Sequence, residues 1–115
     1  MRTVKLLTLL MLMLIGLPAA VQAQFTFTTN NGAITITGYT GSSVVVTVPG
    51  TTNGLSVTSI GNSAFYNKSN LTFVAIPDSV TNIGSSAFYS CSSMTNLTLG
   101  TNVINIGVTP PFLSS

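Results

Sequence analysis

Side chains that could carry out acid–base or metal chemistry are almost absent from this chain. Its 115 residues include three Lys or Arg, one Asp or Glu, one Cys and no His. General acid–base catalysis needs a positioned titratable group, and a zinc site needs three or four Cys, His or carboxylate ligands. We therefore predict no catalytic residue, no metal ligand and no cofactor, and we expect a protein that is not an enzyme.

Two isolated residues could still be reactive, and each has a simpler explanation. Ser69 follows Lys68, but adjacency in sequence does not supply the oriented base and oxyanion site that a nucleophilic serine needs. Cys91 has no second cysteine in the chain with which to pair. It could pair between chains or react as a free thiol, yet free cysteines are usually buried, small apolar side chains. We interpret Cys91 as buried.

The charge of the chain argues against a nucleic-acid partner. Its charged residues are Arg2, Lys5, Lys68 and Asp78, with a formal net charge of +2. Removal of a signal segment that contains Arg2 and Lys5 would leave one positive and one negative charge. Nucleic-acid binding depends on Lys and Arg side chains that neutralise phosphates. We therefore predict no nucleic-acid partner.

Residues 1–23 have the three-part pattern of a secretory signal peptide. Two basic residues precede the apolar run Leu6–Leu17, and Pro18 separates this run from several small residues. Twelve apolar residues fall short of the ~20 that a membrane-spanning helix needs. We expect cleavage after Ala23, a secreted or cell-surface protein, and no membrane span once the signal has been removed.

A 23-residue repeat dominates the second half of the chain. Val57–Ser79 and Val80–Asn102 align without a gap, with ten of the 23 positions identical, and a third copy begins at Val103. Units of this size cannot bury an apolar face alone, so they stack into a solenoid. The repeat predicts that Phe65 lies over Phe88 in successive coils.

Each coil is predicted to contain one short strand and one brief helical turn. The L-x-x-V-x-I pattern of Leu71–Ile76 suits a strand with one buried face, and Pro77 ends it. Ile60 and the glycine after it are expected to bring the chain back inward through a turn. Ser63–Tyr66 fits a serine cap followed by about one turn of α- or 3₁₀-helix.

The string IGxSAFYxxSxLTxVxIPxSVTxIG at residues 60–84 resembles the leucine-rich repeats of the BspA-like type, which occur in secreted and surface-exposed bacterial proteins and in some microbial eukaryotes. The resemblance implies a mainly β, leucine-rich-repeat solenoid. It also implies attachment to proteins, other cells or glycans, without specifying which. The family often has cysteine at the position of Cys91, but Lys68 occupies that position in the preceding coil, so no cysteine ladder is expected.

Residues 24–56 are predicted to form a β-hairpin-rich N-terminal cap. The alternation in Phe25–Thr28 and in Ile34–Thr37 fits half-buried strands joined by a turn at Asn30-Asn31-Gly32. Val46-x-Val48-Pro49 echoes the V-x-I-P of the first repeat, with five additional residues before the next coil. The predicted organisation is a signal peptide at 1–23, the cap at 24–56, and repeats at 57–79, 80–102 and, in part, 103–115.

The repeat pattern breaks after Gly107. Val108–Phe112 replaces the expected Ser-x-Ala-Phe, and its two prolines prevent a regular helical turn. Either this tail is a short C-terminal cap or the chain is a truncated fragment of a longer array, and we favour truncation. An uncapped end of a solenoid would allow self-association.

The leading functional hypothesis is a non-enzymatic module for protein or glycan recognition or adhesion. Residues between the buried positions of a strand point to the opposite face. The candidate partner-binding residues are therefore Phe73, Ala75, Asn96 and Thr98. Phe73 is the expected anchor, although it could instead pack beneath a neighbouring loop.

Two other functions are alternatives to recognition. One is a structural spacer or envelope element, or a fragment without a ligand of its own. The other is ice or mineral binding through rows of Thr-x-Thr. We disfavour ice or mineral binding because the pairs Thr26/Thr28 and Thr35/Thr37 lie outside the repeat.

Overall fold

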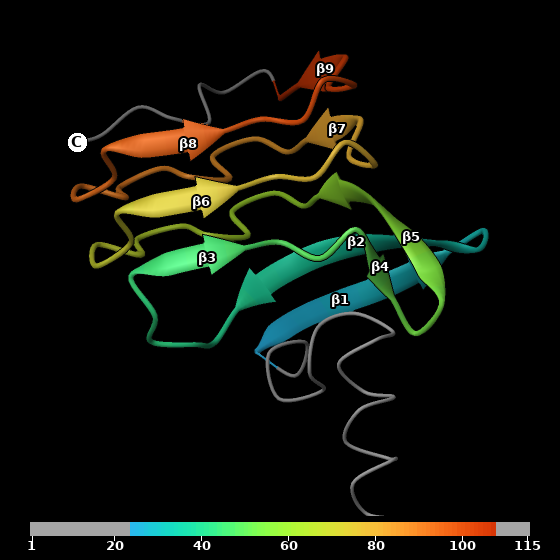
Figure 1. Ribbon diagram of the computed structural model, residues 1–115, viewed down its shortest axis with the longest axis horizontal. Coiled ribbons are helices and arrows are strands. Elements are labelled where there is room, and N and C mark those ends of the chain that lie inside the picture. The colour runs from blue at the N-terminus through green and yellow to red at the C-terminus, as the bar shows by residue number, and fades with distance from the viewer. Residues whose placement is uncertain (1–23, 108–115) are drawn as a thin grey trace, which may run out of the picture.

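The computed structural model describes residues 24–107, which form a β-solenoid of nine strands and, over this range, no helix. Coils are stacked one above another, and each passes through two sheets (Figure 1). One sheet has the order β1-β2-β5-β7-β9, with β4 beside β5, and the other has the order β3-β6-β8. The strands are β1 Phe25–Asn30, β2 Ala33–Tyr39, β3 Val45–Thr47, β4 Thr51–Thr52, β5 Leu55–Ile60, β6 Phe73–Ala75, β7 Asn82–Ile83, β8 Asn96–Thr98 and β9 Asn105–Ile106.

The N-terminal hairpin covers the first coil, as the sequence predicts. Strands β1 and β2 are antiparallel, and β2 then pairs in parallel with β5. The turn between β1 and β2 has left-handed backbone at Asn31 (φ 51°) and Gly32 (φ 77°). Asn and Gly are the residues that adopt this conformation most easily, which explains why the Asn-Gly pair marks the hairpin.

Equivalent apolar residues of successive coils lie side by side. In the three-stranded sheet, Val46 pairs with Val74, and Val74 pairs with Leu97. The predicted strand in each repeat is therefore confirmed. The echo of V-x-I-P upstream of the repeat also has a structural basis, because β3 occupies the same place in its coil as β6.

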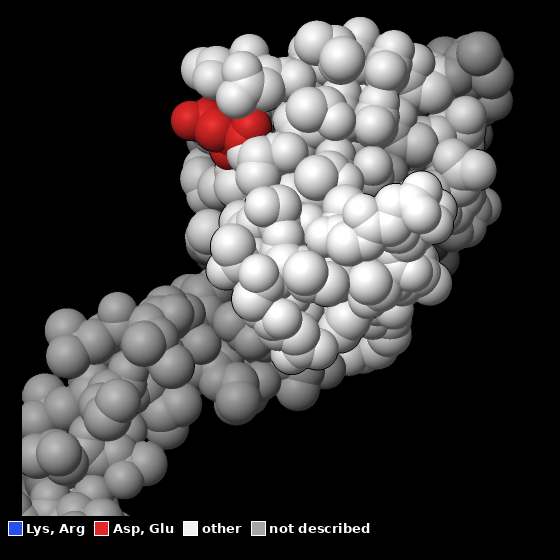
Figure 2. Space-filling model, turned by 90° about the vertical axis from the view of Figure 1, so that its right-hand side faces the viewer, with Lys and Arg blue, Asp and Glu red and all other residues white. Residues whose placement is uncertain are grey.

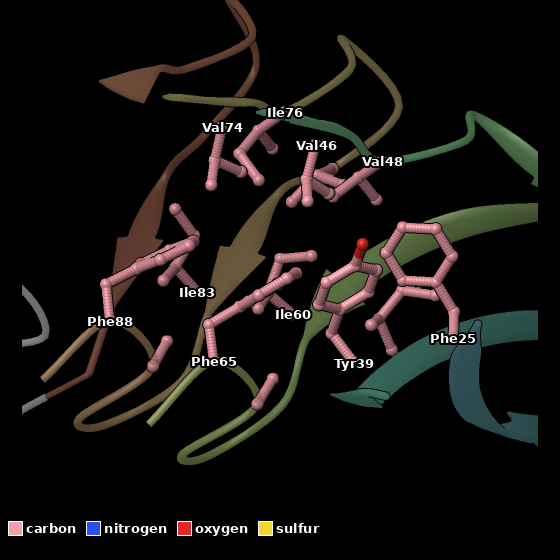
Figure 3. Packing of buried hydrophobic residues seen from close by; sticks show 14 of the residues in the cluster. Phe25, Tyr39, Val46, Val48, Ile60, Phe65, Val74, Ile76, Ile83 and Phe88 are labelled. Atoms are coloured by element: carbon pink, nitrogen blue, oxygen red, sulfur yellow. The ribbon is translucent and has the colours of Figure 1, made fainter. Parts of the chain in front are cut away.

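The aromatic residues form a continuous column through the core (Figure 3). The rings of Phe65 and Phe88 are stacked with centroids 5.1 Å apart and an interplanar angle of 8°. Tyr39 lies on the other side of Phe65 at 5.9 Å, and Phe25 lies 5.2 Å from Tyr39. The prediction that Phe65 lies over Phe88 is confirmed, and the hairpin continues the column beyond the repeats.

The prediction of one strand per coil is incomplete. The Ile-Gly segments, expected to be turns, contribute β5, β7 and β9 to a second parallel sheet, in which Ile60 pairs with Ile83. The N–H of Gly84 donates to the carbonyl of Ile60 at 2.7 Å, and the N–H of Gly107 donates to that of Ile83 at 2.8 Å. Only two residues per coil take part in this ladder, so the sequence shows no alternating run.

The predicted helical turn at Ser63–Tyr66 is wrong. The N–H groups of Ser63 and Phe65 donate to the carbonyls of Ser85 and Ala87 in the next coil, at 3.0 and 2.8 Å. Only the intervening N–H groups bond locally, for example Tyr66 to Ser63 at 3.0 Å. A helix would need every N–H for its own carbonyls. Here, half of them join neighbouring coils instead.

Polar side chains also join the coils at a separation of 23 residues. The side-chain amide of Asn105 donates to Asn82 Oδ1 at 2.7 Å, and the N–H of Ser85 donates to Asn62 Oδ1 at 2.8 Å. Buried or edge backbone groups need such partners. The abundance of Asn, Ser and Thr in the repeats therefore has a structural role between coils.

Two predicted segments, the signal peptide at 1–23 and the tail from Val108 onward, lie outside the described residues. Between residues 24 and 107, the structure contains no helix long and apolar enough to cross a membrane.

Candidate binding surface

The outer face of the three-stranded sheet brings the four predicted residues together. Phe73 pairs with Asn96, and Ala75 pairs with Thr98, in neighbouring parallel strands β6 and β8. Val74, between Phe73 and Ala75, is fully buried. Since successive side chains of a strand point to opposite faces, the four residues share the face that points away from the core.

Their exposure differs between the two strands. Asn96 and Thr98 are exposed, whereas Phe73 and Ala75 have intermediate burial. Phe73 lies in the central strand of the sheet, with a neighbouring strand on each side. It is therefore a partly covered ring in the middle of the face, flanked by more exposed residues.

Sequence reasoning missed a third strand on this face. Val45 pairs with Phe73, and Thr47 pairs with Ala75, so β3 adds one apolar and one hydroxyl side chain. Val45 is 53% exposed, so its side chain points to solvent and not into the core. The sequence does contain a pattern that identifies this strand. Val46-x-Val48-Pro49 resembles the V-x-I-P of the first repeat, and aligning the two gives the register of β3 against β6. We call the set Val45, Thr47, Phe73, Ala75, Asn96 and Thr98 the outer face.

The outer face carries no charged side chain. In the described part of the chain, Lys68 and Asp78 are the only Lys, Arg, Asp or Glu residues. Asp78 lies elsewhere, where its carboxylate accepts hydrogen bonds from the N–H of Thr101 at 2.9 Å and from its hydroxyl at 3.3 Å. In the view of Figure 2, Asp78 is the only charged residue visible among those described. Shape, apolar contact and neutral hydrogen bonds are thus the means of recognition that the outer face offers.

The two isolated reactive candidates do not form a catalytic site. Cys91 is buried, and its thiol donates to the carbonyl of Phe65 at 3.0 Å. Burial raises the pKa of the Cys91 thiol above its ordinary value of 9.0, more than the nearby Lys68 lowers it. A buried, protonated thiol is a poor nucleophile. The interpretation of Cys91 as a buried small side chain is confirmed.

The described residues contain no group of three or more His, Cys, Asp or Glu side chains that could hold a metal ion. Ser69 is exposed, and no hydrogen bond in the described range joins its hydroxyl to the amine of Lys68. Among residues 24–107, neither Ser69 nor Cys91 is therefore hydrogen-bonded to a side chain that could act as its base.

A family model matches more than half of the chain. The model described as BspA type Leucine rich repeat region (6 copies) covers residues 48–109. This range includes β4 to β9 and begins inside the segment that the sequence assigned to the cap. No curated protein matches the chain.

Several solved structures share the fold. A leucine-rich repeat protein from T. pallidum is 30% identical, with a TM-score of 0.71, and the match covers 73% of this chain and 40% of that one. A leucine-rich cell-surface protein from Faecalibacterium prausnitzii is 40% identical, with a TM-score of 0.66, over 73% of this chain and 25% of that one. A leucine-rich repeat protein from Bacteroides capillosus is 35% identical, with a TM-score of 0.66, over 72% and 66% of the two chains. This chain thus spans less than half the length of the first two.

Proposed function

Because the chain belongs to the family of BspA-type leucine-rich repeat proteins, we propose that it is a non-enzymatic recognition module at the cell surface or in the secreted fraction, which binds a protein or a glycan. The family match over residues 48–109 and the similarity to a cell-surface protein of F. prausnitzii support the location. The fold by itself supports many functions, so the argument for binding depends on the outer face.

The observation that carries this proposal is the register of the three-stranded sheet. It aligns Val45, Phe73 and Asn96 in one row across β3, β6 and β8. A partly covered aromatic ring with apolar and amide neighbours provides contact area at low entropic cost. Aromatic anchors of this kind dominate many interfaces, where their truncation costs ~2 kcal/mol or more. A neutral face favours a partner that is itself neutral at the contact.

The experiment measures binding of the purified protein to immobilised extracellular-matrix proteins and to an array of neutral and acidic glycans. Phe73→Ala and Asn96→Ala should each weaken binding to any matrix protein or neutral glycan that the unaltered protein retains. The expected loss is at least tenfold for Phe73→Ala. A matched control is Asn30→Ala, since Asn30 is also an exposed strand asparagine but belongs to β1 in the other sheet.

The opposite results are equally informative. If Phe73→Ala and Asn96→Ala bind as tightly as the unaltered protein, the outer face is not the contact surface. If neither the matrix proteins nor the glycan array retains the protein, the alternative of a structural spacer or envelope element is favoured, because a spacer needs no specific ligand.

A further inference from the structure

A hollow lies apart from the outer face, beside the residues at which β3 and β6 begin. It has a volume of about 250 Å³ and is lined by the loop after β2 and the loop before β6. Leu71 and Tyr39 form its buried part, with 2% and 4% of their surfaces exposed. The remaining lining residues are Gly41, Ser42, Ser43, Asn67, Lys68, Ser69 and Asn70.

Lys68 is the only basic residue in the described part of the chain, and it lines this hollow. Its side chain has no ion-pair or hydrogen-bond partner among the described residues, and the single described acid, Asp78, is bonded to Thr101. In the next coil, the equivalent position is Cys91, which is buried. The positive charge is therefore confined to one coil and to one hollow.

The polar groups around Lys68 are largely free to bind. The Ser42 and Ser69 hydroxyls and the Asn67 and Asn70 amides are exposed, and no hydrogen bond within the described range uses these side-chain atoms. The Tyr39 hydroxyl donates to Gln24 Oε1 at 3.3 Å, so it can still accept one hydrogen bond. A cation is thus surrounded by neutral hydrogen-bond donors and acceptors.

The backbone of this hollow leaves room only for glycine at one position. A Cβ atom added at Gly41 would overlap the hydroxyl of Tyr39. Glycine therefore lets the loop after β2 approach Tyr39 closely, which sets one wall of the hollow.

We propose that this hollow binds the carboxylate-bearing ring of an acidic saccharide, such as a uronic acid. One ammonium group pairs with one carboxylate, and the hydroxyl and amide groups match the several hydroxyls of a sugar. The volume of about 250 Å³ is below the roughly 300 to 1,000 Å³ of pockets for drug-sized ligands, so it suits a single ring.

An acidic segment of a protein is the less suitable partner. Such a segment presents several carboxylates and few hydroxyls, whereas the hollow offers a single cation and at least four neutral polar side chains. The inference is independent of the proposed function, because the outer face neither contains Lys68 nor lines this hollow.

The test is an NMR titration of the purified protein with methyl glucuronide, and with methyl glucoside as the neutral counterpart. Saturable shifts are expected at Ser42–Ser43 and Asn67–Leu71, with affinity at least tenfold higher for the glucuronide. Lys68→Gln should remove this preference, and Lys68→Arg should keep most of it. Phe73→Ala, a change on the outer face, should leave glucuronide binding unchanged, which separates this inference from the proposed function.

Four results would overturn the inference. These are equal affinity for glucuronide and glucoside, unchanged binding in Lys68→Gln, the same shifts with acetate at equal concentration, and tighter binding of a pentaglutamate peptide. The acetate result would indicate a simple anion site, and the peptide result would indicate a protein ligand. Retained dispersion of the spectrum in Lys68→Gln shows that any loss is not caused by unfolding.

Discussion

The Cys91 thiol is held in its protonated form by its surroundings. Burial raises its pKa above 9.0, and its hydrogen is donated to the Phe65 carbonyl. The folded state therefore retains this proton more strongly than the unfolded chain does. The thiol's contribution to the free energy of unfolding is complete below about pH 9 and is lost as the pH rises further.

This pH dependence can be measured by urea unfolding of the unaltered protein and of Cys91→Ala. We expect the unaltered protein to be more stable at pH 7, and its advantage to be smaller at pH 10.5. The two proteins share every titrating group except the thiol. The contributions of the other groups therefore cancel in the difference between them. An advantage that stays constant over this pH range would contradict the assignment.

Thr52 is the one residue in the described range with a buried side-chain hydroxyl that has no hydrogen-bond partner. Its side chain is only 3% exposed, and an unsatisfied buried polar group costs about 1 to 3 kcal/mol. Valine has nearly the same shape without the hydroxyl. We therefore expect Thr52→Val to raise the free energy of unfolding by ~1 kcal/mol, as measured by urea titration.

The neighbouring residue supplies a matched control for this substitution. Thr51 is exposed in the same strand, β4, so Thr51→Val should change stability by less than about 0.5 kcal/mol. A loss of stability in Thr52→Val would show that the hydroxyl has a bound partner, such as a buried water molecule.

At the scale of the element, the turn segments between β5 and β6 and between β7 and β8 contain residues with left-handed backbone. Ser63 and Asn67 have left-handed φ values of 58° and 59°, and the equivalent Ser86 and Ser90 have values of 57° and 62°. This conformation costs a non-glycine residue roughly 1 kcal/mol, and glycine adopts it freely. The same strain thus occurs twice in each of two coils.

Replacement of Ser86 by glycine should relieve this strain. We expect Ser86→Gly to raise the free energy of unfolding by about 0.5 kcal/mol, since the gain is reduced by the greater entropy of glycine in the unfolded chain. Ser85→Gly is the control, because Ser85 has no left-handed backbone and should lose about 0.5 to 1 kcal/mol. Equal effects of the two substitutions, read from thermal unfolding, would contradict the strain argument.

The sequence predicted those elements that alternating apolar residues specify. The strand of each repeat and the N-terminal hairpin follow from patterns such as L-x-x-V-x-I and Asn-Asn-Gly. The turn at Ser63–Tyr66 could not be predicted in this way, since serine before alanine and phenylalanine suits a helix N-terminus equally well. Hydrogen bonds to the next coil decide the conformation, and a local pattern does not contain them.

The candidate outer face was predicted only in part for a related reason. Phe73, Ala75, Asn96 and Thr98 lie in repeats, where a fixed period gives the register. Val45 and Thr47 lie before the repeat, in the segment predicted as a cap, so the 23-residue period does not include them and only the V-x-V-P echo gives their register against β6. The hollow around Lys68 was not predicted at all, because it joins loops that are more than 20 residues apart in sequence.

At the scale of the whole molecule, the aromatic column is the feature that connects the hairpin with the coils. Phe65 lies between Tyr39 and Phe88, at 5.9 and 5.1 Å. Phe88 stacks on Phe65, and it lines a hollow of about 350 Å³ with Cys91 and Met94. Replacement of Phe65 by alanine and replacement of Phe88 by alanine should therefore lower the free energy of unfolding by different amounts.

We expect Phe65→Ala to lower the free energy of unfolding by about 3 to 5 kcal/mol, because an enclosed cavity would remain. Phe88→Ala should cost less, by at least ~1 kcal/mol, because the adjoining hollow lets the structure or solvent fill the space. Urea unfolding of both variants provides the measurement. If Phe88→Ala were the more costly change, the hollow beside Phe88 would not relieve the loss of the ring.

The last described coil exposes apolar residues that the coil below it buries. Ile106 is 48% exposed and Leu99 is 37% exposed, whereas the equivalent Ile83 and Ile76 are 2% and 4% exposed. Strands β8 and β9 also have only one neighbour each within the described range. Self-association at this end stays a prediction, and exposed apolar residues beside unpaired strand edges are the features that favour it.

Sedimentation velocity at increasing protein concentration measures this association. Ile106→Lys should shift the protein toward the monomer, because burying a charge at the contact is costly. Val45→Lys adds the same charge at a residue of similar exposure, 53%, on the outer face. It should leave the association unchanged. If Val45→Lys disperses the protein and Ile106→Lys does not, the copies meet through the outer face, and the surface proposed for recognition is the one by which they associate.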